Sequence, residues 1–126
     1  MHVRHILPLL LLAVPAAASA QSMNAEHFYQ RSTKLMAKGP MALFSRGEIK
    51  LLIGEAERSI QAARNRRLAD VAAGKPPRSC PPPGKHPMDN SEFMKRLGAI
   101  PAAERQRVDM TEAMTRITIA RFPCPR

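Results

Sequence analysis

The sequence predicts an all-α fold, a small disulfide-stapled helical domain of four main helices, one of them long. Apolar residues recur at helical spacing in four segments, and no segment alternates convincingly with the period of two that marks a half-buried strand. Residues that cap helices precede these segments, and glycine or proline follows most of them. The chain also carries two cysteines, Cys80 and Cys124, each beside a proline.

The first helix is expected over residues 23–38. Ser22 or Asn24 can cap it, because either side chain can accept a hydrogen bond from the free backbone N–H groups of the first turn. Gly39 and Pro40 would then end the helix, since proline cannot continue it. The face expected to be buried carries Ala25, Phe28, Leu35 and Met36.

The long helix is expected over residues 45–73. Ser45 and Glu48 have the spacing of a capping box, and Phe44 and Ile49 stand where a hydrophobic staple would fix the first turn. Such a helix would be about 42 Å long, so a kink in its second half, at the arginine cluster described below, is left open. The apolar stripe comprises Ile49, Leu52, Ile53, Ala56, Ile60 and Ala63, continued by Leu68 and Val71.

Residues 75–87 contain six prolines and Gly84, which exclude a helix or a central strand. We expect a rigid, extended loop that carries Cys80. Two capped helices follow, one from near Asp89 and the last from Asp109, with a turn or single-turn helix opened by proline between them. Their inward positions are expected to be Phe93, Met94 and Leu97, then Met110, Ala113, Met114, Ile117 and Ala120.

Residues 1–20 have the composition of a secretory signal peptide: a positive start, a short apolar core and small residues before Ala20. The apolar core is too short to cross a bilayer of about 30 Å, so no membrane-spanning segment is expected. Cleavage after Ala20 would leave a single domain, residues 21–126, in the periplasm. In that oxidising compartment Cys80 and Cys124 are expected to form a disulfide, worth about 4 kcal/mol for a loop of about 45 residues.

The chain carries 20 Lys and Arg against 10 Asp and Glu, a net charge of +10. This balance favours acidic partners, such as anionic lipid headgroups, cell-wall polymers or an acidic protein, and export argues against nucleic acid. The densest cluster, Arg64, Arg66 and Arg67, is either a solvated helix face or a docking patch.

The proline-rich loop contributes the other candidate contacts, Arg78, Lys85 and His86, within residues 78–88. A loop that is already ordered loses little entropy on docking, which suits a recognition role. The same prolines also fit a simple connector, and both interpretations stay open.

No enzyme, cofactor or metal centre is expected. The chain after Ala20 has only two histidines and no nucleophile motif, and its acidic residues mostly begin helices. One alternative left open is a copper-handling protein that uses His86 and Met88. The further methionines Met94, Met110 and Met114 also fit core positions. A second alternative is a non-catalytic envelope structural protein attracted to anionic surfaces.

A set of motifs in the second half carries a family resemblance. They are Ser79-Cys80-Pro81, Phe93, Leu97, Ile100-Pro101-Ala102-Ala103-x-Arg105, Ala113 and Arg121-Phe122-Pro123-Cys124. Together with the stretch from Lys38 to Phe44, they resemble the Rap/Tai family of immunity proteins of type VI secretion systems. The extra cysteines that many family members have in their first half are missing here.

This resemblance implies an all-helical periplasmic protein without catalytic residues, able to form a homodimer. Family members neutralise secreted cell-wall amidases by occluding the active-site groove, commonly with a loop. The resemblance therefore implies a secreted effector, a cell-wall hydrolase, as the partner. No inhibitory residue can be carried over, because no loop of this chain matches one in the family residue by residue.

Overall fold

The computed structural model describes residues 22–126, so the expected signal peptide lies outside the described residues. These residues form six helices and no strand, which confirms the all-α prediction. The elements are α1 (Ala25–Ala37), the 3₁₀ helix η1 (Gly39–Phe44), α2 (Arg46–Ala72), α3 (Asn90–Ala99), α4 (Ala102–Arg105) and α5 (Met110–Arg121).

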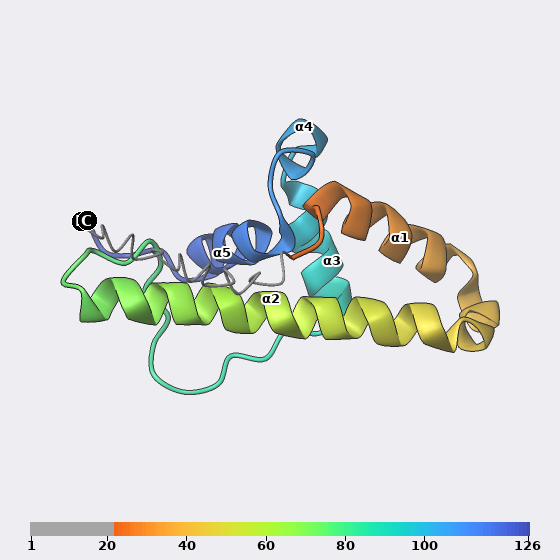
Figure 1. The fold of residues 1–126 in the computed structure, drawn as a ribbon, viewed down its shortest axis with the longest axis horizontal. Helices are drawn as coiled ribbons and strands as arrows, with labels where there is room; N and C mark the ends of the chain where they lie inside the picture. Colours follow the sequence, from red (N-terminus) through yellow and green to blue (C-terminus); the bar gives the residue numbers. More distant parts are fainter. Residues whose placement is uncertain (1–21) are drawn as a thin grey trace, which may run out of the picture.

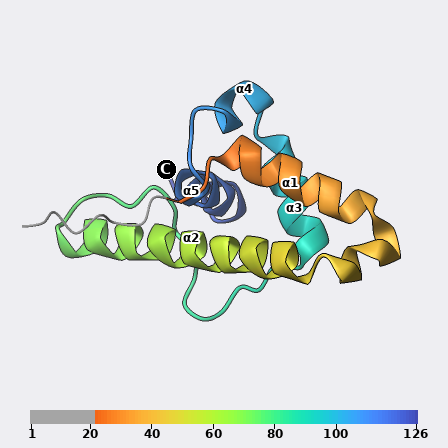
Figure 2. The same ribbon diagram turned by 45° about the vertical axis from the view of Figure 1, so that its right-hand side comes forward.

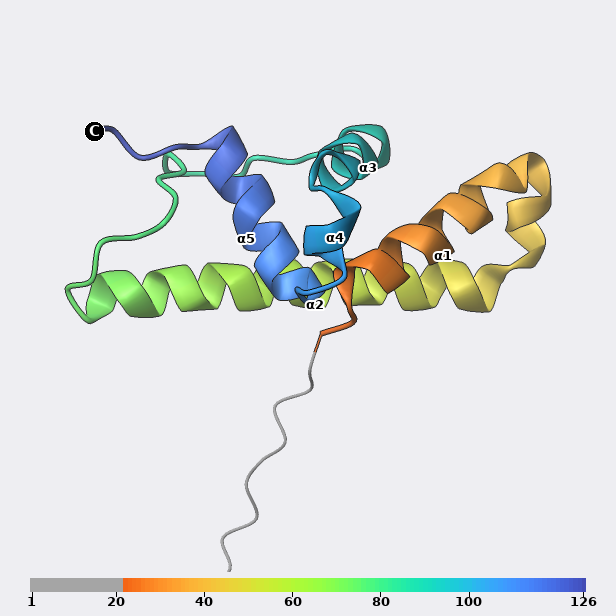
Figure 3. The same cartoon turned by 90° about the horizontal axis from the view of Figure 1, so that it is seen from above.

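Helix α2 runs the length of the domain, and the other helices pack along one side of it (Figure 1). Its most extensive contact is with α5, which crosses its C-terminal half obliquely (Figure 3). Helix α1 lies over the other half of α2, and α3 stands between α1 and α5 (Figure 2). Helices α1 and α2 meet at η1, which forms one end of the molecule.

The core lies where α1, α2, α3 and α5 converge. Phe28 and Phe93 pack edge to face there, with ring centroids 5.9 Å apart, as aromatic pairs prefer. Met88 and Met94 pack against the same cluster. The buried apolar residues are Ala25, Phe28, Leu52, Leu97, Met110, Ala113, Met114 and Ile117. Ala120, expected to face inward, is exposed.

Three of the predicted caps are present. Asn24 Oδ1 accepts hydrogen bonds from the first turn of α1, and Asp89 and Asp109 each accept one at 2.8 Å from the backbone N–H three residues on. Ser22 instead accepts a hydrogen bond from the Thr111 backbone N–H at 3.1 Å. The start of the described chain is thereby attached to the start of α5.

The capping box predicted at the start of α2 is wrong. The Ser45 side chain caps no backbone group and accepts a hydrogen bond from Lys38 Nζ at 2.9 Å. Glu48 instead accepts two hydrogen bonds from the Arg31 guanidinium, at 2.7 and 2.6 Å, and such charge-assisted pairs are stronger than a neutral cap. The predicted staple is also absent, because Phe44 is 84% exposed.

Helix α2 is continuous, with no break at the arginine cluster, and it buries only part of the predicted stripe. Leu52 is buried and Ala56 and Ala63 pack against the core as expected, whereas Ile53 and Ile60 are 51% and 45% exposed. Glu55 and Ser59 take the buried positions beside Leu52. The packed side of α2 is therefore rotated away from its most apolar side. Leu68 and Val71, at the end of the predicted stripe, are exposed as well.

Candidate functional site

The segment from Lys75 to Met88, called the proline loop below, connects α2 to α3 without regular structure. It leaves the C-terminal end of α2 and bulges below α2 in the views of Figures 1 and 2, where α5 lies above α2. The predicted disulfide between Cys80 and Cys124 is present, with Cα atoms 4.8 Å apart. The Cys80 backbone N–H also donates to the Phe122 carbonyl at 2.8 Å. The loop is thus tied to the chain that follows α5.

A second attachment is the ion pair between Arg78 and Glu112, at the N-terminus of α5. Two parallel hydrogen bonds, both 2.9 Å, join the guanidinium to the carboxylate. These bonds lower the pKa of Glu112 and raise the pKa of Arg78, and burial opposes both shifts. Arg78, predicted as a partner contact, therefore already has an anionic partner within the chain.

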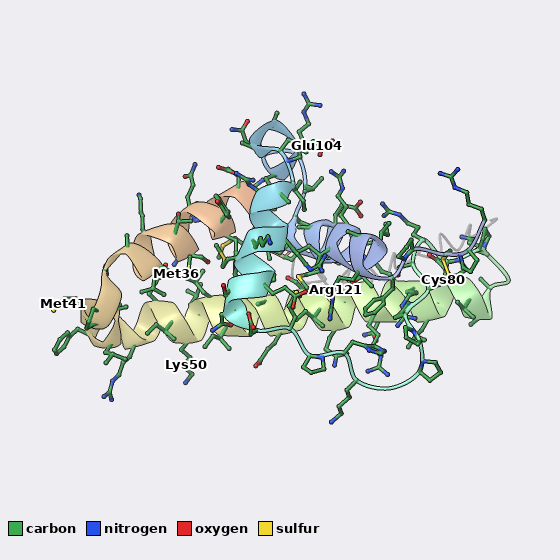
Figure 4. The ribbon with its side chains drawn as sticks, turned by 180° about the vertical axis from the view of Figure 1, so that it is seen from behind. Met36, Met41, Lys50, Cys80, Glu104 and Arg121 are labelled. Carbon is green, nitrogen blue, oxygen red and sulfur yellow. A yellow bond between two sulfur atoms is a disulfide. The ribbon has the colours of Figure 1, made fainter. Side chains whose placement is uncertain are left out.

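The far part of the proline loop is closed by His86. Its Nε2 lies 2.7 Å from the Pro82 carbonyl oxygen, and its ring packs on Phe122 with centroids 4.8 Å apart. Arg121 Nη1 donates to the His86 carbonyl at 3.1 Å (Figure 4). Gly84 has a φ of +106° between these contacts, a conformation that a residue with a Cβ rarely adopts.

These contacts leave a small exposed crown on the proline loop. Its residues are Pro82, Pro83, Gly84 and Lys85. Lys85 is exposed and makes no ion pair with any residue in 22–126, so it is the predicted contact on the loop whose charge is available to a partner. His86 is half-buried and contributes to the base of the crown.

The arginine cluster forms a separate surface. Arg64 and Arg66 are exposed on α2 and Arg67 is half-buried. Within residues 22–126 no hydrogen bond or ion pair links these three side chains to the proline loop. The arginine cluster and the proline loop are therefore treated as two candidate contact surfaces.

Sequence reasoning missed a buried arginine. Arg105 is 6% exposed, pairs with Glu26, and donates to the carbonyls of Gly98 and Ile100. Its guanidinium also lies over the Tyr29 ring, 4.1 Å from the centroid. The motif Pro-Ala-Ala-x-Arg contains this residue, but nothing in the motif indicates burial. Arg105 holds α1, α3 and α4 together and is not available to a partner.

The residues of the copper alternative are used in packing. Met110 and Met114 lie in the core, and Met88 and Met94 pack against it. Among the described residues no group of three or more His, Cys, Asp and Glu is arranged to hold a metal ion. In the same part of the chain, no helix combines the length and apolarity needed to cross a bilayer.

The comparisons with known proteins give no relative. No protein-family model matches the chain, and neither a curated protein nor a solved structure matches it. The Rap/Tai resemblance therefore stays a prediction from the motifs.

Proposed function

We propose that this chain is an exported protein-binding module that neutralises a type VI secreted cell-wall amidase. It acts without catalysis, by placing the crown of the proline loop in the active-site groove of the enzyme. The observation that carries this proposal is the fixation of the loop at Cys80, Arg78 and His86 while the crown stays exposed.

Fixation of the loop matters because a flexible inhibitory loop would lose conformational entropy on binding, which would weaken its affinity for the enzyme. Each flexible side chain immobilised on binding costs about 0.5–1.5 kcal/mol, and a loop that is ordered beforehand avoids much of this. Prolines restrict the backbone of the crown further, since each fixes φ near −65°. The crown therefore presents a rigid shape that a groove can accept.

Charge supports an acidic partner. The chain has a net charge of +10, and exposed Lys85, which makes no ion pair within residues 22–126, places part of this charge at the crown. Long-range attraction of this kind raises association rates and loses strength in salt. The arginine cluster is a second surface that can attract the effector, at the edge of the contact rather than in the groove.

The expected signal peptide and the Rap/Tai motifs support the compartment and the class of effector. The same resemblance supports a homodimer, and α2 offers exposed apolar residues, Ile53 and Ile60, to a second copy. Both the effector and the homodimer are proposals.

The test uses the purified, oxidised protein and a cell-wall amidase encoded beside it. We expect a stoichiometric complex and loss of peptidoglycan hydrolysis. K85E is expected to weaken the complex by about tenfold or more, because it reverses the crown charge. K95E makes the same change on α3, where Lys95 is exposed and makes no ion pair within residues 22–126, and should leave affinity within about twofold.

Equal effects of K85E and K95E would exclude the crown as the contact. Full hydrolysis in the presence of excess wild-type protein would exclude the proposed function itself.

A further inference from the structure

The end of the molecule opposite the proline loop exposes large apolar side chains. Met41, Leu43 and Phe44 on η1, called the apolar tip, are 63%, 70% and 84% exposed. Figure 4 shows Met41 at the extreme end of the domain, with Met36 on α1 behind it. Among the described residues, the principal contacts of η1 are with α1 and α2 alone. No part of the described chain covers the tip.

Four exposed cations flank the apolar tip along the chain, Lys34 and Lys38 before it and Arg46 and Lys50 after it, and are called the basic collar. None of them makes an ion pair within residues 22–126. Lys38 donates to the neutral Ser45 hydroxyl, and its ammonium contributes less than Arg31 does to the lowered pKa of Glu48.

The carboxylate nearest to this end does not cancel the collar. Glu48 is held by two hydrogen bonds from Arg31, which lower its pKa and keep it ionised within that pair. The next exposed carboxylate along α2, Glu57, lies about 10 Å beyond Lys50. The residues that flank the apolar tip in the chain therefore carry a net positive charge.

The apolar surface continues a short way along α2. A shallow, open hollow is lined there by Ile49 and Ile53, and its charged residues are Arg46, Lys50, Arg58 and one carboxylate, Glu57. Apolar side chains among charges that are net positive thus extend from η1 onto the first turns of α2.

We propose that the apolar tip and the basic collar dock on an anionic phospholipid surface. Apolar side chains would enter the boundary between headgroups and acyl chains, about 5–10 Å deep, while the cations contact lipid phosphates. Lysine and arginine suit this position, because their stems can lie along apolar surface while their charged ends stay at the headgroups. An acidic protein groove would need an apolar floor of matching shape, whereas a lipid surface accepts the irregular tip.

Docking at the tip leaves the disulfide-bonded part of the proline loop free, because Met41 and Cys80 lie near opposite ends of α2 (Figure 4), a helix about 40 Å long. The inference therefore goes beyond the proposed function and does not rest on it. The protein would be held at the membrane surface by one end while the other end meets its partner.

Vesicle binding tests the tip. The oxidised exported form is sedimented with vesicles of phosphatidylglycerol and phosphatidylethanolamine, and with vesicles of phosphatidylcholine. We expect binding to the anionic vesicles only, falling as salt rises. The double variant L43S/F44S should lose binding by about tenfold or more, because it removes the inserted apolar area. L68S/V71S removes exposed apolar residues from the other end of α2 and should change binding less than about twofold.

Two triple variants with the same loss of charge distinguish an effect of the basic collar from an effect of the net charge. K34Q/R46Q/K50Q and R64Q/R66Q/R67Q each remove three cations. The collar triple should abolish binding, and the arginine-cluster triple should retain most of it. Equal losses would show attraction by net charge alone and would overturn the proposal.

Insertion has its own readout, because the sequence contains no tryptophan. F44W should shift its emission to the blue and be quenched by brominated lipids, while L68W should do neither. Wild-type binding that survives L43S/F44S would overturn the proposal. A second result would also overturn the proposal: no vesicle binding by the wild type, together with loss of effector binding in L43S/F44S. That result would assign the tip to a protein partner. The hydrolase assay contains no lipid, so failure of this proposal is distinguishable from failure of the proposed function.

Discussion

The two ends of α2 differ in how they are held and in what they expose. At the C-terminal end, a segment without regular structure is fixed by a disulfide, a bidentate ion pair and an aromatic contact. At the N-terminal end, the hairpin of α1 and α2 is joined by the ion pair of Arg31 and Glu48 and carries apolar side chains in solvent. Cross-links thus occur where a defined loop shape is kept, and the most exposed apolar side chains, Leu43 and Phe44, lie where the helices already define the shape.

The largest expected effect comes from removing the disulfide. C80S/C124S should lower the free energy of unfolding by about 4 kcal/mol, because the unfolded chain regains the entropy of an open loop. Denaturant unfolding measures this loss. Hydrogen exchange should rise at the Cys80 amide and stay unchanged at the tip. Equal melting temperatures with and without reductant would contradict the prediction.

The next effect concerns the Arg78–Glu112 pair. E112Q should cost about 1 kcal/mol at pH 7, because the pair is partly exposed and its attraction is screened by solvent. Hydrogen bonds from Arg78 depress the folded pKa of Glu112, so the pair stabilises the fold above the ordinary carboxyl pKa of about 4.3. That contribution is lost as pH falls through the depressed value.

Acid titration of stability checks this sign: the wild type should lose more stability on acidification than E112Q. The matched variant E48Q breaks the equivalent pair at the tip end, where hydrogen bonds from Arg31 also lower the pKa of Glu48. E48Q should raise hydrogen exchange in η1 and leave the proline loop unchanged. A rise in both regions would show that the two ends are not independent.

A position between the two ends gives an effect of similar size and opposite sign. The Ser59 hydroxyl is fully buried and has no hydrogen-bond partner among residues 22–126. S59A should raise the free energy of unfolding by about 1 kcal/mol, because it removes an unsatisfied polar group and favours the helix. Thermal unfolding measures the change, with S91A on exposed Ser91 as the control. A lower melting temperature for S59A would indicate a hydrogen bond at this hydroxyl.

The smallest effect is expected at the tip. F44S should change the free energy of unfolding by less than about 0.5 kcal/mol, because Phe44 is 84% exposed. Thermal unfolding of F44S beside F93S, which alters a core-packed ring, provides the scale. A large loss in F44S would show that the tip packs on a surface of its own chain.

Local patterns predicted local structure well. The caps at Asn24, Asp89 and Asp109 involve groups two or three residues away, so spacing alone identifies them. The pairing of the two cysteines was predicted from the expected oxidising compartment and from their even number, without knowledge of their distance.

Features that depend on distant groups were not predictable in the same way. Glu48 does not form the predicted capping box because its carboxylate pairs with Arg31, which lies on another helix. Arg78 was expected at a contact surface, yet its partner Glu112 lies 34 residues away. The stripe on α2 was misplaced because α1 and α5 decide which of two adjacent sides is covered.

The attachment of Ser22 to Thr111 has a consequence for how the chain reaches its native state. The first described residues also exchange backbone hydrogen bonds with Val108 and Met110, so the earliest and latest parts of the domain must meet. Such distant pairings form slowly, and here they wait for α5, the last helix to be synthesised. The domain therefore completes its core only after α5 has been synthesised.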